Sequence, residues 1–138
     1  MIILDTNVLS ALMLRVPDTT VVAWLDQQPP TSIWTTSVTV FEIRFGLEAM
    51  PAGGRRSALS QDFEKLLASI DRRIISFDFE AAQEAAILMA SRKLTGRPRE
   101  LRDTMIAGIV QAHRATLATR NASHFDDLSG PVVNPWGA

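Results

Sequence analysis

Short apolar runs alternate with longer segments of helical periodicity along the chain. An apolar run of a few residues, bounded by polar or turn residues, is typical of a strand buried in a parallel sheet. The strand-like runs are residues 2–4, 33–36, 74–77, 116–119 and 132–133, and the helical segments are residues 8–14, 18–25, 37–47, 55–70, 78–94 and 101–114. This alternation predicts an α/β fold, a three-layer α/β/α sandwich with a mainly parallel central sheet.

The length of 138 residues predicts a single domain, residues 1–138, with a core that needs no covalent staple. The helical segments place apolar residues at spacings of three and four. In residues 37–47 this pattern predicts that Val40, Phe41, Phe45 and Leu47 face the core.

The composition restricts the available chemistry. The chain has no cysteine and two histidines, which excludes thiolate catalysis and Cys-ligated zinc and leaves oxygen as the main donor for a metal site. No segment is long and apolar enough to span a bilayer, and the N-terminus lacks the basic and small-residue features of a signal peptide. We therefore expect a cytoplasmic protein without a membrane partner.

The formal net charge of −1 gives no general attraction to nucleic acid, but basic residues gather in one stretch. The stretch contains Arg92, Lys93, Arg97, Arg99 and Arg102, with only Glu100 opposing them. Two interpretations stay open. These cations either lie in solvent near the C-terminal end of a helix and complement its dipole, or form a track for a phosphate backbone.

Asp5 directly follows the first apolar run, where it would stand at the carboxyl end of a buried strand. Open α/β sheets bind ligands at this edge. An ionised group beside a core also needs a hydrogen-bonding partner, a cation or water. Asp5 is therefore the first candidate functional residue.

Two further acids are candidates to join Asp5. Glu42 lies among apolar residues, and on a helix it shares a face with Val38 and Phe45, although a solvent-facing position is the alternative. Asp103 precedes a helical run, where capping of the helix N-terminus would also explain it. Together the three carboxylates suit Mg²⁺ or Mn²⁺, which would polarise a phosphoryl oxygen and lower the pKa of a water molecule.

A fourth contributor is expected from the loop after residues 116–119. Asn121 lies nearest the strand end and could hydrogen-bond to a water at the metal, whereas Asp126 and Asp127 carry charge but lie farther along. His124 could act as a base, but a single loop histidine is usually a surface residue.

Four segments, in their order and spacing, resemble the PIN domain family, and within it the VapC-type, FitB-like toxins. They are residues 5–9 (DTNVL), 42–46 (EIRFG), 102–107 (RDTMIA) and 119–121 (TRN), the last followed by Phe125. The resemblance extends over nearly the whole chain. It implies a ribonuclease with an α/β/α fold and an acidic site dependent on Mg²⁺ or Mn²⁺, acting on RNA as the toxin of a type II toxin–antitoxin pair. It also implies a homodimer and a cognate antitoxin, which inhibits the toxin and alone carries the domain that binds operator DNA.

Matched by position, Asp5, Glu42 and Asp103 correspond to the first three acids of that family, and Thr6 to the small polar residue beside the first. The resemblance implies that Asp5 and Asp103 are metal ligands and that Glu42 ligates the metal or orients the hydrolytic water. Asn121 stands where many relatives have aspartate, which leaves one metal or two open. It is expected to position water or phosphate, with Asp126 as a less favoured substitute.

Two other functions are compatible with parts of the pattern. A phosphatase of the haloacid dehalogenase type also places an aspartate after an N-terminal strand, but its chemistry needs a second aspartate where this chain has Asn7. A regulatory binding module, in which a partner's arginine enters the acidic site, requires no catalysis and is compatible with Asn121.

Overall fold

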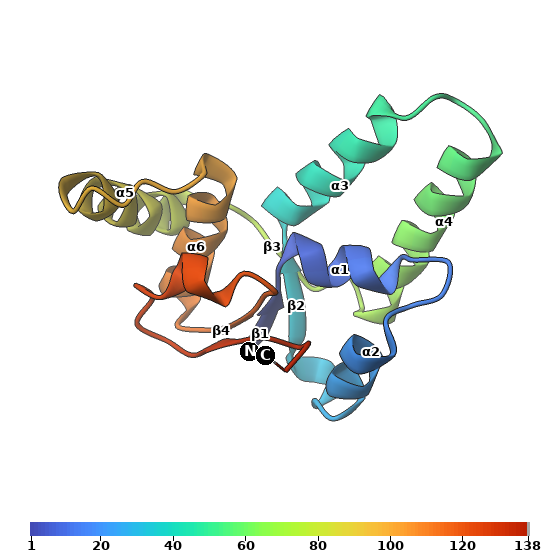
Figure 1. The fold of residues 1–138 in the computed structure, drawn as a ribbon, viewed down its shortest axis with the longest axis horizontal. Helices are drawn as coiled ribbons and strands as arrows, with labels where there is room; N and C mark the ends of the chain where they lie inside the picture. The colour runs from blue at the N-terminus through green and yellow to red at the C-terminus, as the bar shows by residue number, and fades with distance from the viewer. Residues whose placement is uncertain (138) are drawn as a thin grey trace.

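The structure, a computed structural model, describes residues 1–137, and strands and helices alternate along them (Figure 1). The strands are β1 (Ile2–Leu4), β2 (Ile33–Thr36), β3 (Ile74–Ile75), β4 (Thr116–Ala118) and β5 (Val132–Val133). The helices are α1 (Thr6–Leu12), α2 (Thr19–Asp26), α3 (Ser37–Ala49), α4 (Gly54–Ser69), α5 (Phe79–Leu94) and α6 (Leu101–His113), with 3₁₀ turns at Pro30–Ser32 and Ala122–Phe125. Within residues 1–137 no helix has the length and apolar character needed to cross a bilayer.

The sheet has the order β3-β2-β1-β4-β5, and every neighbouring pair is parallel. Strand β1 is central, with Ile3 paired to Trp34 on one side and to Leu117 on the other. The chain builds outward from β1 in one direction through β2 and β3, and in the other through β4 and β5. The crevice between the carboxyl ends of β1 and β4 is therefore the topological switch point of the sheet, where open α/β sheets bind ligands.

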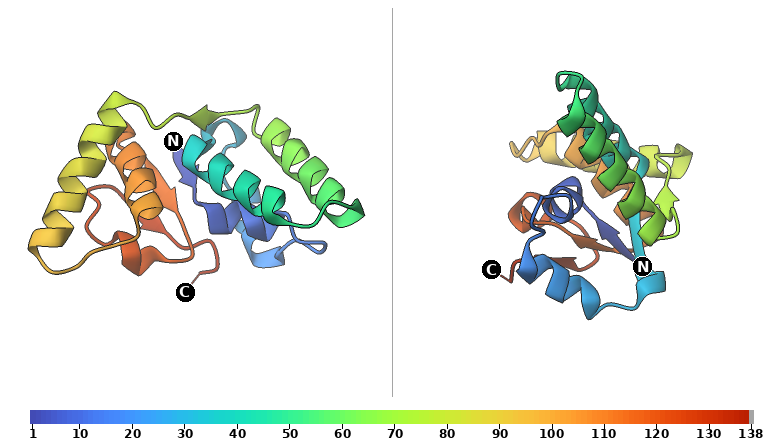
Figure 2. Two further views of the ribbon diagram at one scale, coloured as in Figure 1. Left: turned by 90° about the horizontal axis from the view of Figure 1, so that it is seen from above. Right: turned by 90° about the vertical axis from the view of Figure 1, so that its right-hand side faces the viewer.

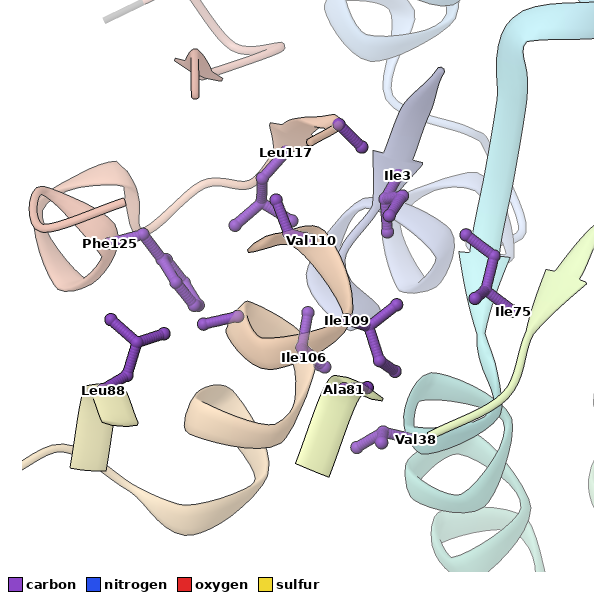
Figure 3. Close-up of a cluster of buried hydrophobic side chains, with 12 residues drawn as sticks. Ile3, Val38, Ile75, Ala81, Leu88, Ile106, Ile109, Val110, Leu117 and Phe125 are labelled. Carbon is purple, nitrogen blue, oxygen red and sulfur yellow. The ribbon is translucent and has the colours of Figure 1, made fainter. Parts of the chain in front are cut away.

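Helices cover both faces of the sheet, which confirms the predicted α/β/α sandwich (Figures 1 and 2). Helices α5 and α6 pack on one face, where Ile3, Ile75, Val110 and Leu117 converge on one buried cluster (Figure 3). Helices α1, α2 and α4, with most of α3, cover the other face around a second buried cluster. Consecutive residues of β1 enter opposite clusters because side chains alternate along a strand.

The prediction that Phe41 and Phe45 face the core is wrong. Their exposed fractions are 58% and 61%, and the two rings stack on each other with centroids 6.3 Å apart. The buried residues of α3 are Val38, Thr39, Ile43 and Leu47. Helix α3 lies beside α4 and projects away from the sheet (Figures 1 and 2). Val38, at its start, joins the cluster under α5 and α6, and Ile43 and Leu47 join the cluster on the other face, whereas the two phenylalanines are exposed.

Gly108 permits the close contact of α6 with α5. A Cβ at this position would lie 2.5 Å from the backbone oxygen of Ala81 and 2.6 Å from the Cβ of Ala85. We expect Gly108→Ala to lower the free energy of unfolding by about 2 kcal/mol, the scale of overpacking in a close-packed core. Urea unfolding would measure this change.

Gly46 supplies the matched control, because it lies inside α3 and an added Cβ there would meet no atom within 4 Å. Gly46→Ala is expected to raise the free energy of unfolding by about 0.5–1 kcal/mol through helix propensity alone. Equal effects of the two substitutions would contradict the packing argument.

Candidate active site

Asp5 lies at the carboxyl end of β1, at the switch point of the sheet, and only 4% of the residue is exposed. Its backbone N–H continues the ladder by donating to the oxygen of Ala118, 2.9 Å away. Its side chain caps α1, which begins at Thr6 and not at the predicted residue 8, because Oδ1 accepts from the Thr6 N–H at 2.8 Å. Capping therefore gives one carboxylate oxygen, Oδ1, a hydrogen-bond donor, and the other oxygen, Oδ2, needs a second donor.

Thr119 holds that second oxygen. It follows β4, is fully buried, and its hydroxyl donates to Asp5 Oδ2 at 2.8 Å. The same hydroxyl accepts from the backbone N–H of Asn121 at 3.1 Å and from Asn7 Nδ2 at 3.4 Å. Thr119 was not among the predicted site residues. Its position one residue past a strand neighbouring β1 was the available signal, because parallel strands end at one edge of the sheet.

Glu42 projects from α3 towards the same edge. Its Oε1 accepts from the Thr6 hydroxyl at 3.0 Å, and that hydroxyl lies 3.1 Å from the buried hydroxyl of Thr39. The Glu42 side chain is 21% exposed, so the solvent-facing interpretation of this residue is wrong. Thr6 therefore contacts two of the predicted acids, Asp5 through its N–H and Glu42 through its hydroxyl.

Asp103 is the third residue of α6 and does not cap it. The cap is Glu100, whose side chain accepts from the Asp103 N–H at 3.1 Å. The capping explanation for Asp103 is therefore wrong, and its own carboxylate remains available at the first turn of the helix. A free carboxylate here is also favoured by the helix dipole.

The pKa values of all three carboxyl groups are raised. Burial raises the pKa of Asp5 from 3.8 to about 6, against the hydrogen bonds from Thr119 and Thr6 that lower it, and the charges of Asp103 and Glu42 raise it further. Burial is also the main cause of the raised pKa of Glu42 and of Asp103. Acids perturbed by burial and by one another are a mark of functional sites.

Asn121 lies three residues past the end of β4 and lines the same cleft as Asp5, Glu42 and Asp103. The alternative fourth residue, Asp126, is instead paired with Arg97 at 2.9 Å. His124 is exposed. Burial and the charge of Glu100 raise the pKa of Asp103, and His124 opposes them by lowering it. The four predicted site residues therefore line one cleft of about 520 Å³, to which Asp126 does not contribute.

The basic stretch does not form a continuous track. Arg92 is buried and paired with Asp127, Arg97 is paired with Asp126, and Arg102 is paired with Glu100. In residues 1–137 this leaves Lys93 and Arg99 as the members of the stretch without an ion pair. The basic residue that lines the cleft is Arg120, which lies outside this stretch.

The donor set of the cleft fits a hard divalent cation. Within residues 1–137, no three Asp, Glu or His side chains are gathered closely enough to hold one ion directly. Mg²⁺ needs fewer, because it typically takes one or two carboxylates and keeps water in its other positions. Asp5 supports this fit. Burial and two acidic neighbours make its ionised form costly, and a bound cation would offset that cost.

Comparison with known proteins finds one family and several relatives that match nearly the whole chain. The PIN domain family matches residues 2–131. The chain is 40% identical to VapC ribonuclease Y4jK of Sinorhizobium fredii over 99% of this chain and 98% of that protein. It is 33% identical to Toxin FitB of Neisseria gonorrhoeae over 99% of each.

Among solved structures, FitAB bound to an IR36 DNA fragment matches with a TM-score of 0.90 at 32% identity. The match covers 100% of this chain and 97% of that one. The relatives are thus similar over their full length, in the same fold, and at identities above the range in which only a fold is shared. This chain belongs to the PIN domain family.

Proposed function

We infer that this protein is an endoribonuclease dependent on Mg²⁺ or Mn²⁺ and that it acts as the toxin of a type II toxin–antitoxin pair. The observation that carries the proposal is the meeting of Asp5, Glu42 and Asp103, each with a raised pKa, in one cleft at the switch point of the sheet. The similarity to a protein named VapC ribonuclease and to one named Toxin FitB supports the substrate class and the biological role.

In this proposal Asp5 and Asp103 hold the cation, and Glu42 either holds it or orients the water that attacks the phosphate. The bound cation would supply Lewis-acid activation of the phosphoryl oxygen. Thr119 and Thr6 fix the orientation of Asp5 through two hydrogen bonds of 2.8 Å. Thr6 also fixes Glu42, so a single threonine sets the distance between two acids. Asn121 lines the cleft, and in this proposal its amide positions water or phosphate.

The surface next to the cleft supports the proposed protein partners. A larger groove of about 1190 Å³ runs between α1 and the α3–α4 pair and shares Thr6 and Glu42 with the cleft. An antitoxin segment in this groove would reach the acids and block them, and operator DNA would be reached through that antitoxin. The exposed stack of Phe41 and Phe45 offers an apolar surface for the proposed homodimer.

The function is tested by the metal dependence of RNA cleavage. We expect the full-length protein, freed of any partner, to cut single-stranded RNA in the presence of Mg²⁺ or Mn²⁺. Excess chelator should reduce cleavage to the level of a sample without protein, and added Mn²⁺ should restore it. Cleavage that persists at full rate in chelator would reject the metal mechanism. A protein that binds RNA or a partner but cuts nothing at saturating metal would instead support the regulatory binding module.

A further inference from the structure

Arg120 and Trp136 form a pair at one end of the acidic cleft. The guanidinium carbon of Arg120 lies over the Trp136 ring, 4.7 Å from its centroid. Both residues line the cleft that contains Asp5, Glu42 and Asp103, and Arg120 is the only basic residue in that lining within residues 1–137. Arg102 lies outside that lining, although its Nη1 is 4.0 Å from Glu42 Oε2. The proposed mechanism leaves both Arg120 and Trp136 unused.

Trp136 is held rigidly. Its indole Nε1–H donates to Asp18 Oδ2 at 3.0 Å, and its backbone N–H donates to Asn134 Oδ1 at 2.9 Å. Asp18 is itself fixed as the cap of α2, accepting from Thr20 and Val21. The ring also packs against the buried cluster beneath α1 and α2. Arg120 therefore rests on a ring that the protein has already immobilised.

Arg120 is tied to the catalytic acid through its backbone. Its N–H donates to Asn7 Oδ1 at 3.2 Å, and its neighbour Thr119 donates to Asp5. Its side chain is exposed, and no ion pair joins it to a carboxylate in residues 1–137, although its charge adds to the effect of the Val21 N–H in lowering the pKa of Asp18. One face of the guanidinium therefore rests on the Trp136 ring, and the side chain is open to solvent. The backbone contacts hold residue 120 close to Asp5.

We propose that Arg120, supported by Trp136, forms a subsite for the nucleotide that flanks the scissile phosphate of a single-stranded RNA. This inference rests on the proposed ribonuclease function. Unpaired bases stack on arginine planes as well as on aromatic rings, and the same guanidinium can neutralise a backbone phosphate. Stacking accepts every base, so the subsite would position the RNA without selecting its sequence. An acidic peptide would pair with the edge of the Arg120 guanidinium and has no need of its open face, which makes RNA the favoured ligand.

The test compares Arg120→Ala, which removes both the charge and the planar group, with Arg120→Lys, which keeps the charge and removes only the planar group. Each is made in an Asp5→Asn background that prevents cleavage, and binding of a short single-stranded oligoribonucleotide of mixed sequence is followed by fluorescence anisotropy. We expect both variants to raise the dissociation constant about tenfold, the scale of losing one stacked base. Only Arg120→Ala should also reduce the salt dependence of binding, by about one phosphate contact.

Lys93→Ala is the matched control, because Lys93 is exposed on α5, lies outside the cleft and carries the same charge. It should leave the dissociation constant unchanged. An equal effect of Lys93→Ala, or full binding by Arg120→Lys, would overturn the subsite, because either result reduces Arg120 to a general charge. Unchanged RNA binding in Arg120→Ala, together with weakened binding of a labelled acidic peptide in the same assay, would overturn it in favour of a peptide contact. Because binding is measured without cleavage, failure of the subsite is distinguishable from failure of the ribonuclease activity.

Discussion

Asp5→Asn is expected to abolish RNA cleavage and, in the metal-free protein at neutral pH, to raise the thermal midpoint. Cleavage should fall at least about a hundredfold, the scale on which one lost electrostatic contact slows an enzyme. The gain in stability follows from burial, which raises the pKa of Asp5 to about 6 and makes its ionised form costly in the folded state. A neutral amide removes that cost and keeps the oxygen that accepts from Thr6.

The sign of the pH dependence follows from the same shift. Since the pKa of Asp5 is 3.8 in the unfolded chain and about 6 in the folded one, the folded state binds more protons between these values. The contribution of Asp5 to stability is therefore fully favourable below pH 3.8 and is lost as the pH rises through 6, by about 3 kcal/mol in total. The advantage of Asp5→Asn should therefore grow as the pH rises through this window and be complete above it, and lost hydrogen bonding to Thr119 will reduce it.

Differential scanning fluorimetry in chelator, at pH 4.5 and at pH 7.5, measures this difference. At pH 7.5 the midpoint of Asp5→Asn should exceed that of the unsubstituted protein by about 5 °C. Added Mn²⁺ should then stabilise the unsubstituted protein and leave Asp5→Asn unchanged. Asp26→Asn, at an exposed site at the end of α2, is the control and should alter neither activity nor midpoint. A metal-free Asp5→Asn protein that is less stable than its parent at pH 7.5 would show that Asp5 serves as a cap and not as a strained ligand.

The fold was predictable because short apolar runs, typical of buried strands, alternate in the sequence with segments of helical periodicity. Each pattern indicates its type of element without reference to the neighbouring elements. The orientation of a helix is a different matter, as Phe41 and Phe45 show. Their spacing is helical, but which side of α3 meets the sheet depends on where α4 packs, and no local pattern contains that information. Periodicity therefore identifies a helix more reliably than it identifies the buried face of an amphipathic one.

The acidic residues of the cleft were predictable for a similar reason. Asp5 follows a strand, and the sheet topology alone brings the ends of β1 and β4 together. The partners of the arginines could not be read in the same way, because long side chains reach residues that are distant in sequence. Arg92 pairs with a residue 35 positions away, and Arg120 lies over Trp136. A basic stretch in a sequence thus says little about which charges reach solvent.

The second large effect is expected at the ion pair of Arg92 with Asp127, where the loss of stability should depend on which of the two residues is substituted. The Arg92 side chain is only 4% exposed, whereas that of Asp127 is 34% exposed. Arg92 donates from Nε and Nη2 to both oxygens of Asp127, at 2.7 and 2.9 Å, and from Nη1 to the Thr104 hydroxyl at 2.9 Å. The arginine is therefore the desolvated member, and the aspartate can regain water if it is left alone.

Asp127→Ala should lower the free energy of unfolding by about 3–5 kcal/mol, because it leaves a buried guanidinium without its counter-charge. Arg92→Met should cost less, because methionine fills much of the same volume and Asp127 turns to solvent. The sharpest expectation concerns the double variant. Arg92→Met combined with Asp127→Ala should be more stable than Asp127→Ala alone, since removing the stranded charge removes the penalty. Urea unfolding of the four proteins, analysed as a double-mutant cycle, measures these differences.

The neighbouring residue provides the control. Asp126 pairs with Arg97, and both side chains are more than half exposed, at 51% and 55%. Breaking this pair with Asp126→Ala should cost no more than about 1 kcal/mol, because an exposed pair is screened and each charge stays hydrated. Two adjacent aspartates, each bound to an arginine of the same basic stretch, would then differ severalfold in stability effect through burial alone. Similar losses for Asp126→Ala and Asp127→Ala, or a double variant less stable than Asp127→Ala, would contradict this account. Since Thr104 directly follows Asp103, the buried pair would also connect the stability of α6 to the position of a proposed catalytic acid.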